Sequence, residues 1–189
     1  MKIIIIYLIL LFFGFSLFAD MPVTSFKALV CNKFINNLVE VKIEIKYDED
    51  AESFYMAIPD EKFPMEITIT DEYRDEMYKL IKRFERKYRN AMDWEEEYDL
   101  ELGVLPTAES RFKRHNTWHN SQVNSSVNFF SQSTELHQLI IFYSPMPSRI
   151  DKDITRDGFK LYFWGDDFKE LEKAFQSKVY NNFLKKLGE

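Results

Sequence analysis

Residues 39–47 have the sequence VEVKIEIKY, in which hydrophobic and charged side chains alternate without a break. Successive side chains of a β-strand point to opposite faces, so this alternation predicts a strand with one face on a hydrophobic core and the other in water. Three further strands are expected around it, at residues 24–31, 53–58 and 65–69. The acidic residues 48–50 and the pair Pro59-Asp60 separate these strands as turns.

A long helix is expected to follow the fourth strand. Thr70 or Asp71 would cap its first turn. Hydrophobic residues then recur at spacings of three and four, which predicts about six helical turns with one buried face: Tyr73, Met77, Leu80, Ile81, Phe84, Tyr88 and Met92. The other face is basic, with Lys79, Lys82, Arg83, Arg86, Lys87 and Arg89.

The second half of the chain again places strands before a helix. Gly103 and Pro106 indicate a break in regular structure. The pattern of residues 111–143 then predicts two or three antiparallel strands. Residues 159–164 predict one more strand, after a polar loop at 148–158. A final helix is expected after Gly165, with a stripe of Phe168, Leu171, Phe175, Val179, Phe183 and Leu187. The predicted fold class is α+β: a two-layer domain in which an antiparallel sheet is covered by two amphipathic helices.

The two strand-to-helix junctions resemble each other. Residues 70–75 and 165–170 both place acidic residues at a helix start and an aromatic residue on the buried face. A duplicated strands-then-helix unit would explain this likeness. Ordinary helix capping explains it as well, because any capped amphipathic helix that follows a strand has such a beginning. The sequence leaves both interpretations open.

The N-terminus predicts export. Lys2 precedes an uncharged stretch at residues 3–19, most of it Ile, Leu or Phe, and Ala19 stands directly before Asp20. This order is typical of a secretory signal peptide cleaved after a small residue. The alternative is an uncleaved membrane anchor, because about 17 apolar residues are the lower limit for spanning a bilayer. We expect residues 1–19 to be the signal and residues 20–189 to form a single periplasmic or extracellular domain.

Composition excludes several classes of protein. Residues 1–19 contain one Lys and no acid, so the remaining 170 residues carry a net charge of −7, which argues against general nucleic-acid binding. A single Cys cannot form an intrachain disulfide or a thiolate zinc site, and five isolated glycines exclude Walker and dinucleotide-binding loops. Cys31 is expected to be buried, because it follows the apolar run Ala28-Leu29-Val30.

Three histidines are the candidates for catalysis or metal binding. Polar neighbours favour a strand or loop around His115 and His119, and on a strand the two side chains would lie about 13 Å apart, too far to share a metal ion. His137 could complete a site only through the tertiary fold. Surface-exposed or hydrogen-bonded histidines are the simpler interpretation, and no metal or cofactor is expected.

Charged and aromatic segments offer further candidates. The acidic residues between Asp93 and Glu101 could hold a hard cation, but they lack the spacing of an EF-hand loop, and a solvated segment explains them. The basic helix face, with Arg111, Lys113 and Arg114, could meet an anionic surface, although ion pairing with neighbouring acids is the simpler interpretation. Four aromatics fall outside core-facing positions and indicate either a binding surface or partial burial: Trp94, Trp118, Tyr162 and Trp164.

These observations favour a non-catalytic binding module of the cell envelope or exterior. Its partner would be a protein, lipid or glycan, and it would touch a membrane only transiently, through the signal. The candidate ligand-binding residues are Arg114, His115, Trp118, His119 and His137. One alternative is a hydrolase of an envelope polymer in which one of the three histidines is the general base. The other is a structural protein held at the membrane by an uncleaved anchor.

Overall fold

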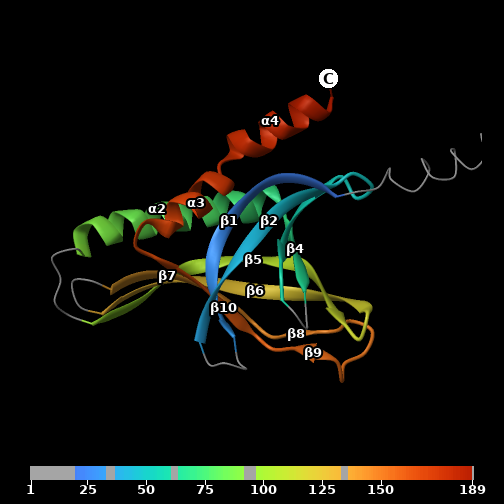
Figure 1. The fold of residues 1–189 in the computed structure, drawn as a ribbon, viewed down its shortest axis with the longest axis horizontal. Helices are drawn as coiled ribbons and strands as arrows, with labels where there is room; N and C mark the ends of the chain where they lie inside the picture. The colour runs from blue at the N-terminus through green and yellow to red at the C-terminus, as the bar shows by residue number, and fades with distance from the viewer. Residues whose placement is uncertain (1–19, 33–36, 61–63, 92–96, 133–135, 189) are drawn as a thin grey trace, which may run out of the picture.

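The structure, a computed structural model, describes residues 20–32, 37–60, 64–91, 97–132 and 136–188. Eight of the described strands form one antiparallel sheet that closes into a barrel, in the order β1-β10-β7-β6-β5-β4-β3-β2 (Figure 1). Their bounds are β1 (Met21–Asn32), β2 (Asn37–Asp48), β3 (Ser53–Ile58), β4 (Met65–Ile69), β5 (Tyr98–Arg114), β6 (Thr117–Gln132), β7 (Leu136–Tyr143) and β10 (Phe159–Trp164). β8 (Met146–Pro147) and β9 (Thr155–Arg156) make a separate short ladder.

The prediction of an α+β fold with an antiparallel sheet is confirmed. The run at residues 39–47 lies in β2, where Ile43, Ile45 and Tyr47 are buried while the intervening side chains reach the outer face. The sheet curves until β1 and β10 pair, so it has a closed cross-section that the strand pattern alone did not reveal. The two-layer description and the duplicated unit stay predictions.

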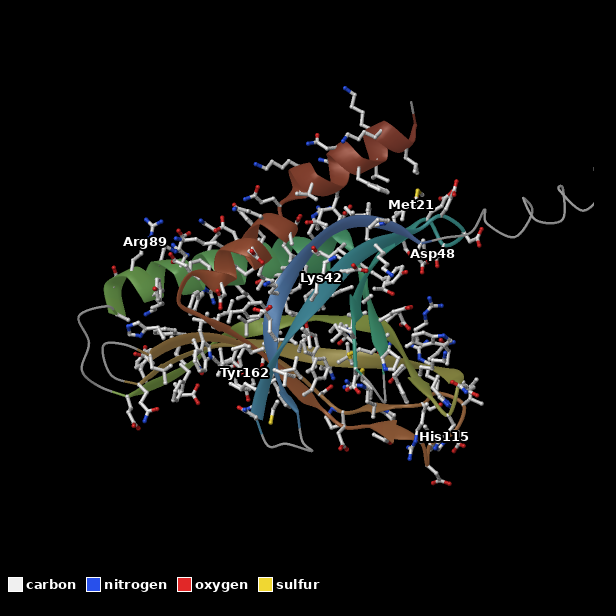
Figure 2. All side chains as sticks on the ribbon, viewed as in Figure 1. Met21, Lys42, Asp48, Arg89, His115 and Tyr162 are labelled. Atoms are coloured by element: carbon white, nitrogen blue, oxygen red, sulfur yellow. The ribbon has the colours of Figure 1, made fainter. Side chains whose placement is uncertain are left out.

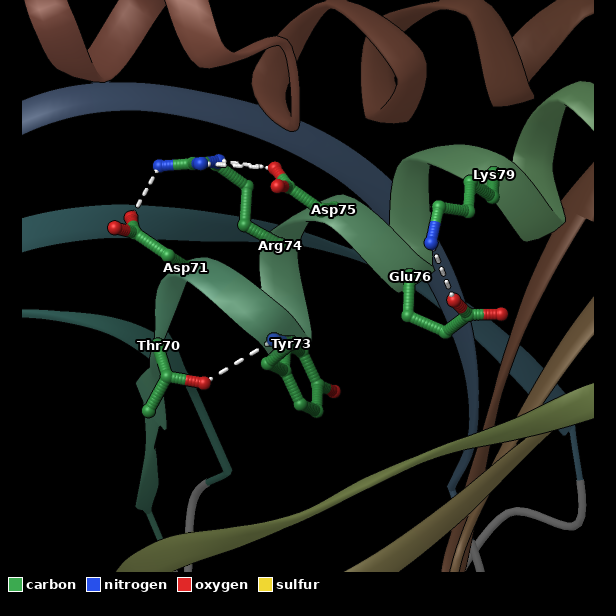
Figure 3. Close-up of polar contacts among 7 residues, drawn as sticks. All are labelled: Thr70, Asp71, Tyr73, Arg74, Asp75, Glu76 and Lys79. Atoms are coloured by element: carbon green, nitrogen blue, oxygen red, sulfur yellow. Dashed lines mark hydrogen bonds and ion pairs between the residues drawn. The ribbon is translucent and has the colours of Figure 1, made fainter.

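Helix α2 (Asp71–Ala91) confirms the long helix and its cap. The Tyr73 backbone N–H donates to Thr70 Oγ1 at 3.1 Å, and Arg74 binds Asp71 and Asp75 across the first turn at 2.6 and 2.8 Å (Figure 3). The predicted stripe is buried at Tyr73, Met77, Leu80, Ile81 and Phe84. The cap anchors the helix at the end of β4, and the stripe packs it against the inner face of β5 and β6 (Figure 1).

β5 begins earlier than the sequence pattern indicated. The expected first strand of this region began near Arg111, whereas β5 begins at Tyr98 and passes through Gly103 and Pro106. The expectation was wrong because both residues sit at shifts in the β5–β6 register, between Glu101 and Gly103 and between Leu105 and Ala108. Such irregularities tolerate Gly and Pro within a strand. A Cβ on Gly103 would lie 2.8 Å from Leu80 Cδ2, so the glycine also lets α2 approach the sheet.

The predicted final helix is two helices, so that prediction was wrong. A short turn at Gly165–Asp167 leads into α3 (Phe168–Ala174), and α4 (Ser177–Leu187) follows after Gln176, whose backbone is extended at φ −72° and ψ 127°. Phe175 remains in the core with its ring centroid 6.2 Å from that of Phe26. The break redirects the chain, so that α4 leans outward from the barrel (Figure 1).

The two neighbours of β1 in the barrel pair with it over very different lengths. β1 and β2 pair along nearly their whole length, whereas β1 and β10 pair only at Leu29 with Tyr162 and at Val30 with Leu161. Beyond this short join the Phe26 ring packs against Phe163 and Phe175, at 6.1 and 6.2 Å between centroids. Side chains of β10 and of the segment after α3 therefore fill the space where the two strands separate.

Cys31 is exposed, and the prediction that it is buried was wrong. In β1 the side chains of Phe26 and Ala28 point into the core, while Lys27 is exposed. Because side chains alternate along a strand, Cys31 belongs to the outward set with Lys27. The apolar run before it concealed this alternation.

Candidate functional site

The β5–β6 hairpin brings four of the five predicted site residues together. Its turn is Arg114-His115-Asn116-Thr117, with φ of 49° at His115 and 64° at Asn116. Positive φ at both central residues is the type I′ geometry of a two-residue hairpin, which usually takes Asn-Gly. His and Asn are among the non-glycine residues that adopt this left-handed conformation most readily. His115 lies at the end of the molecule opposite Arg89 (Figure 2).

Trp118 lies on the outer face of this hairpin. It pairs with Lys113 across the ladder, and the Arg111 guanidinium lies 5.1 Å from the centre of its ring. The indole nevertheless remains 40% exposed. We call this end of the hairpin the hairpin tip. It comprises Arg111, Lys113 and Trp118 on the outer face and the turn residues Arg114 and His115, of which Arg114 alternates to the face of Phe112. The prediction that Trp118 avoids a core-facing position is confirmed.

The opposite face of the hairpin connects the tip to the barrel. His119 pairs with Phe112, and the two rings stack at 5.4 Å between centroids with 23° between planes. Phe112 is fully buried and pairs with Met65 of β4. The Lys113 N–H donates to the Pro64 carbonyl oxygen at 2.9 Å, directly before the start of β4. Residues beyond Lys113 project past β4.

Glu66 fixes the position of Arg111. The two residues pair in the β4–β5 register, and Arg111 Nε donates to Glu66 Oε2. Burial raises the pKa of Glu66, and the hydrogen bond from Arg111 acts in the opposite direction. Glu66 thus neutralises the positive charge of Arg111. The segment Ser110–Asn120, all of which the structure describes, contains three cationic residues, two histidines and no acid. This segment is basic on a chain whose net charge is −6.

His137 does not belong to this group. It is on β7, paired with Ser131, and Ser131 lies twelve residues beyond His119 on β6, about 40 Å at the usual rise of a strand. His137 is 5% exposed, and its Nδ1 shares a hydrogen bond of 2.8 Å with Ser131 Oγ. Its ring meets Tyr88 edge to face at 5.7 Å. Among the described residues no carboxylate binds His137, and its predicted neighbour Glu135 lies outside them.

A chain of buried aromatic and charged groups went unnoticed at the level of sequence. Arg156 is buried, donates to Asp60 Oδ2 at 3.2 Å and covers the Phe159 ring at 4.5 Å. Phe159 stacks on Tyr143 at 4.7 Å, and the Tyr143 and Tyr73 hydroxyls lie 3.4 Å apart. Burial lowers the pKa of Arg156 and raises the pKa of Tyr143 well above its usual value. These contacts attach the loop around β8 and β9 to the barrel core.

Three of the six basic residues on this face of α2 form ion pairs with other described residues, which agrees in part with the simpler interpretation. Lys79 binds Glu76 at 3.0 Å, and Lys82 binds Glu172 of α3 at 3.2 Å as well as Glu85. Arg89 also binds Glu85. Of the acidic segment, Asp93, Glu95 and Glu96 lie outside the described residues, while Glu97 accepts a hydrogen bond from Gln132. Within the described part of the chain, no cluster of three potential metal ligands is found.

No family model, curated protein or solved structure matches this chain. None of the helices that the structure describes is long and apolar enough to cross a membrane. The apolar residues 3–19 and Trp94 lie outside the described ranges. The function is therefore inferred from the geometry of the hairpin tip.

Proposed function

We propose that the protein is an exported, non-catalytic binding module of the cell envelope or exterior, and that the hairpin tip binds an anionic polymer, such as an acidic glycan. The observation that carries the proposal is the Trp118 ring, 40% exposed, on the same strand face as Arg111 and Lys113, near the end of the β5–β6 hairpin. An indole face stacks on a sugar ring, and cations attract carboxylate or sulfate groups.

The turn adds a second exposed side chain to the hairpin tip. Both central residues of this two-residue hairpin turn have positive φ, as the type I′ geometry requires. His115 has this conformation at the point of the hairpin that projects furthest from β4. His115 is exposed to solvent and is not packed in the core. A ligand lying along the hairpin would therefore meet both Trp118 and His115.

The interior of the barrel offers less support for a binding site. Inward-facing residues of opposite strands are almost completely buried, among them Ile43, Met56, Ile67, Phe112 and Val123. They are packed as a continuous hydrophobic core together with the stripe of α2. A ligand is thus expected on the outside of the molecule, where specificity would come from the spacing of charges around one aromatic ring.

A binding experiment with defined polyanions tests this function. The purified protein is titrated with a heparin oligosaccharide, with polygalacturonate and with neutral dextran, and binding is measured by isothermal titration calorimetry. Trp118→Ala should weaken polyanion binding about tenfold, or about 1.4 kcal/mol. Lys113→Gln combined with Arg114→Gln should weaken it and should reduce its dependence on salt.

Trp164→Ala is the matched control, because Trp164 on β10 is exposed to a similar degree, 42%. It should leave binding unchanged. Equal losses from both tryptophan variants, or equal binding of dextran, would contradict the proposal. Export is tested separately by N-terminal sequencing of the released protein, since a first residue at Asp20 excludes the uncleaved anchor.

A further inference from the structure

Helix α4 has a hydrophobic and basic surface that the fold leaves uncovered. Its first half is anchored, because Tyr180 is buried, 4.8 Å from the Phe54 ring and 5.3 Å from the Arg74 guanidinium. In its last turns Leu184 and Leu187 remain 42% and 41% exposed. The helix also carries Lys178, Lys185 and Lys186, and all of Ser177–Leu187 is described and contains no acid.

An acidic turn lies beside this helix. The β2–β3 turn contains Asp48, Glu49, Asp50 and Glu52, and the Ala51 N–H donates to Asp48 Oδ1 at 3.0 Å. Tyr47 of β2 and Phe54 of β3 form a cross-strand pair next to this turn. Both contact Phe183 of α4, at 5.5 and 6.0 Å between ring centroids. The start of β1 at Met21 and the turn at Asp48 lie at the same end of the molecule, below α4 (Figure 2).

Within the described part of the chain, the charged groups of these two neighbouring surfaces form no ion pairs. None of the ion pairs formed by the described residues includes Lys178, Lys185 or Lys186. The same ion pairs leave out the four acids of the turn. A surface that carries a basic hydrophobic patch next to an acidic patch is complementary to a second copy of itself under two-fold rotation, since each patch then meets its opposite.

We propose that two copies of the chain associate through this surface, with α4 of each copy against the acidic β2–β3 turn of the other. Leu184 and Leu187 would be covered at the centre of the contact, and the lysines would meet the acids at its rim. An anionic lipid surface would also attract the lysines, but it would repel the adjacent turn. The charge pattern therefore favours a second copy over a membrane.

The dimer would carry two hairpin tips. One short helix and one turn on each copy make a small interface, so the association is expected to be weak and concentration-dependent. A polymer with repeated anionic groups could contact both tips of one dimer, and this would strengthen binding without any new contact at either tip. This last consequence rests on the proposed function, whereas the dimer itself does not.

Charge reversal with reciprocal rescue tests the dimer. The purified protein is examined by sedimentation equilibrium at rising concentration. Lys185→Glu with Lys186→Glu should weaken association at least about tenfold, and so should Glu49→Lys with Asp50→Lys. The four substitutions together restore opposite charges across the interface and should restore association. Lys152→Glu with Lys160→Glu makes the same change of charge on exposed residues of other elements and should have no effect.

The outcomes separate the alternatives. A protein that stays monomeric at all concentrations, or a fourfold variant that associates no better than the double variants, would overturn the proposal. Vesicles of phosphatidylcholine and phosphatidylglycerol are included in parallel, and co-sedimentation of a monomer that is lost in the lysine variant would assign α4 to a membrane instead. Far-UV circular dichroism establishes that each variant is folded. If the Lys185→Glu, Lys186→Glu variant is monomeric and still binds polyanions, the hairpin tip binds its ligand without the dimer.

Discussion

Gly103 is the position where the packing of α2 on β5 can be tested most directly. A Cβ built on Gly103 would lie 2.8 Å from Leu80 Cδ2 and 3.6 Å from Leu80 Cδ1. Leu80 is 1% exposed, so its side chain cannot turn into solvent to make room. Gly103→Ala should therefore force a shift of the helix or of the Leu80 rotamer, at a cost of about 1–3 kcal/mol.

The expected change is large enough to measure. For a domain of this size a loss of 1 kcal/mol lowers Tm by about 2–4 °C, so Gly103→Ala should lower Tm by about 2–12 °C. Urea unfolding followed by circular dichroism gives the free energy of unfolding. Gly188→Ala is the matched control, because the nearest atom to a Cβ there is 3.8 Å away. Its free energy of unfolding should change by less than about 0.5 kcal/mol.

A double-mutant cycle isolates the contact itself. Leu80→Ala alone should cost about 2–5 kcal/mol, because it leaves a cavity between α2 and β5. In the presence of Leu80→Ala the methyl group of Gly103→Ala no longer meets a side chain and fills part of that cavity. The two changes should therefore couple favourably by about 1 kcal/mol or more. Additive costs, or a Gly103→Ala protein as stable as the unmodified chain, would refute the close approach of α2 to the sheet.

Three other predictions concern groups around the barrel. Because burial raises the pKa of Glu66, its contribution to stability is largest below the ordinary carboxyl range and is lost as pH rises through its folded-state pKa. Arg111→Met removes the hydrogen bond that opposes this shift and should raise the pKa of Glu66 further. An unchanged Glu66 midpoint in an NMR titration would argue against the pair. Ser131→Ala should cost about 1–3 kcal/mol in chemical denaturation by leaving His137 Nδ1 buried without its partner, and adding His137→Phe should recover most of the loss. Changing His115-Asn116 to Asn-Gly should stabilise the type I′ turn by about 0.5–1 kcal/mol in a thermal melt, while Asn-Ala should not.

Periodicity was sufficient to predict the first half of the fold. The strand at residues 39–47 and the helix after Thr70 each bury one face, so the spacing of their apolar residues records their contacts directly. The predicted strand at 53–58 matches β3, and that at 65–69 matches β4. Strands and helices of this kind can be predicted without the tertiary fold, because each one buries a single face against the core.

The failures have a common physical origin in contacts between distant residues. Phe175 continues the spacing of the final helical stripe, but its burial against Phe26 and the extended backbone of Gln176 end α3 there. In the sequence Gly103 suggests a loop, whereas in the fold it is a strand residue that makes room for Leu80 of α2. The closure of the sheet depends on how far it curves, which no local pattern encodes.

The candidate site could be predicted only in part. Arg114, His115, Trp118 and His119 are neighbours because one hairpin contains them all, and alternation correctly kept Trp118 off the core. His137 was grouped with them by residue type alone, and the fold places it near the other end of β6. The burial of Arg156 depends on Asp60 and Phe159. Partners so far apart in the sequence cannot be paired by spacing.

The short join between β1 and β10 has a consequence for the timing of folding. β1 is the first strand of the barrel and β10 the last, and they meet at only two residue pairs. The ring cannot close until nearly all of the chain has been synthesised, and contacts between residues so distant in sequence form slowly. A protein that crosses a membrane through a secretory channel must remain unfolded until it has passed. Under the export proposed above, slow closure at this join would lengthen the time during which the chain can be translocated before it folds.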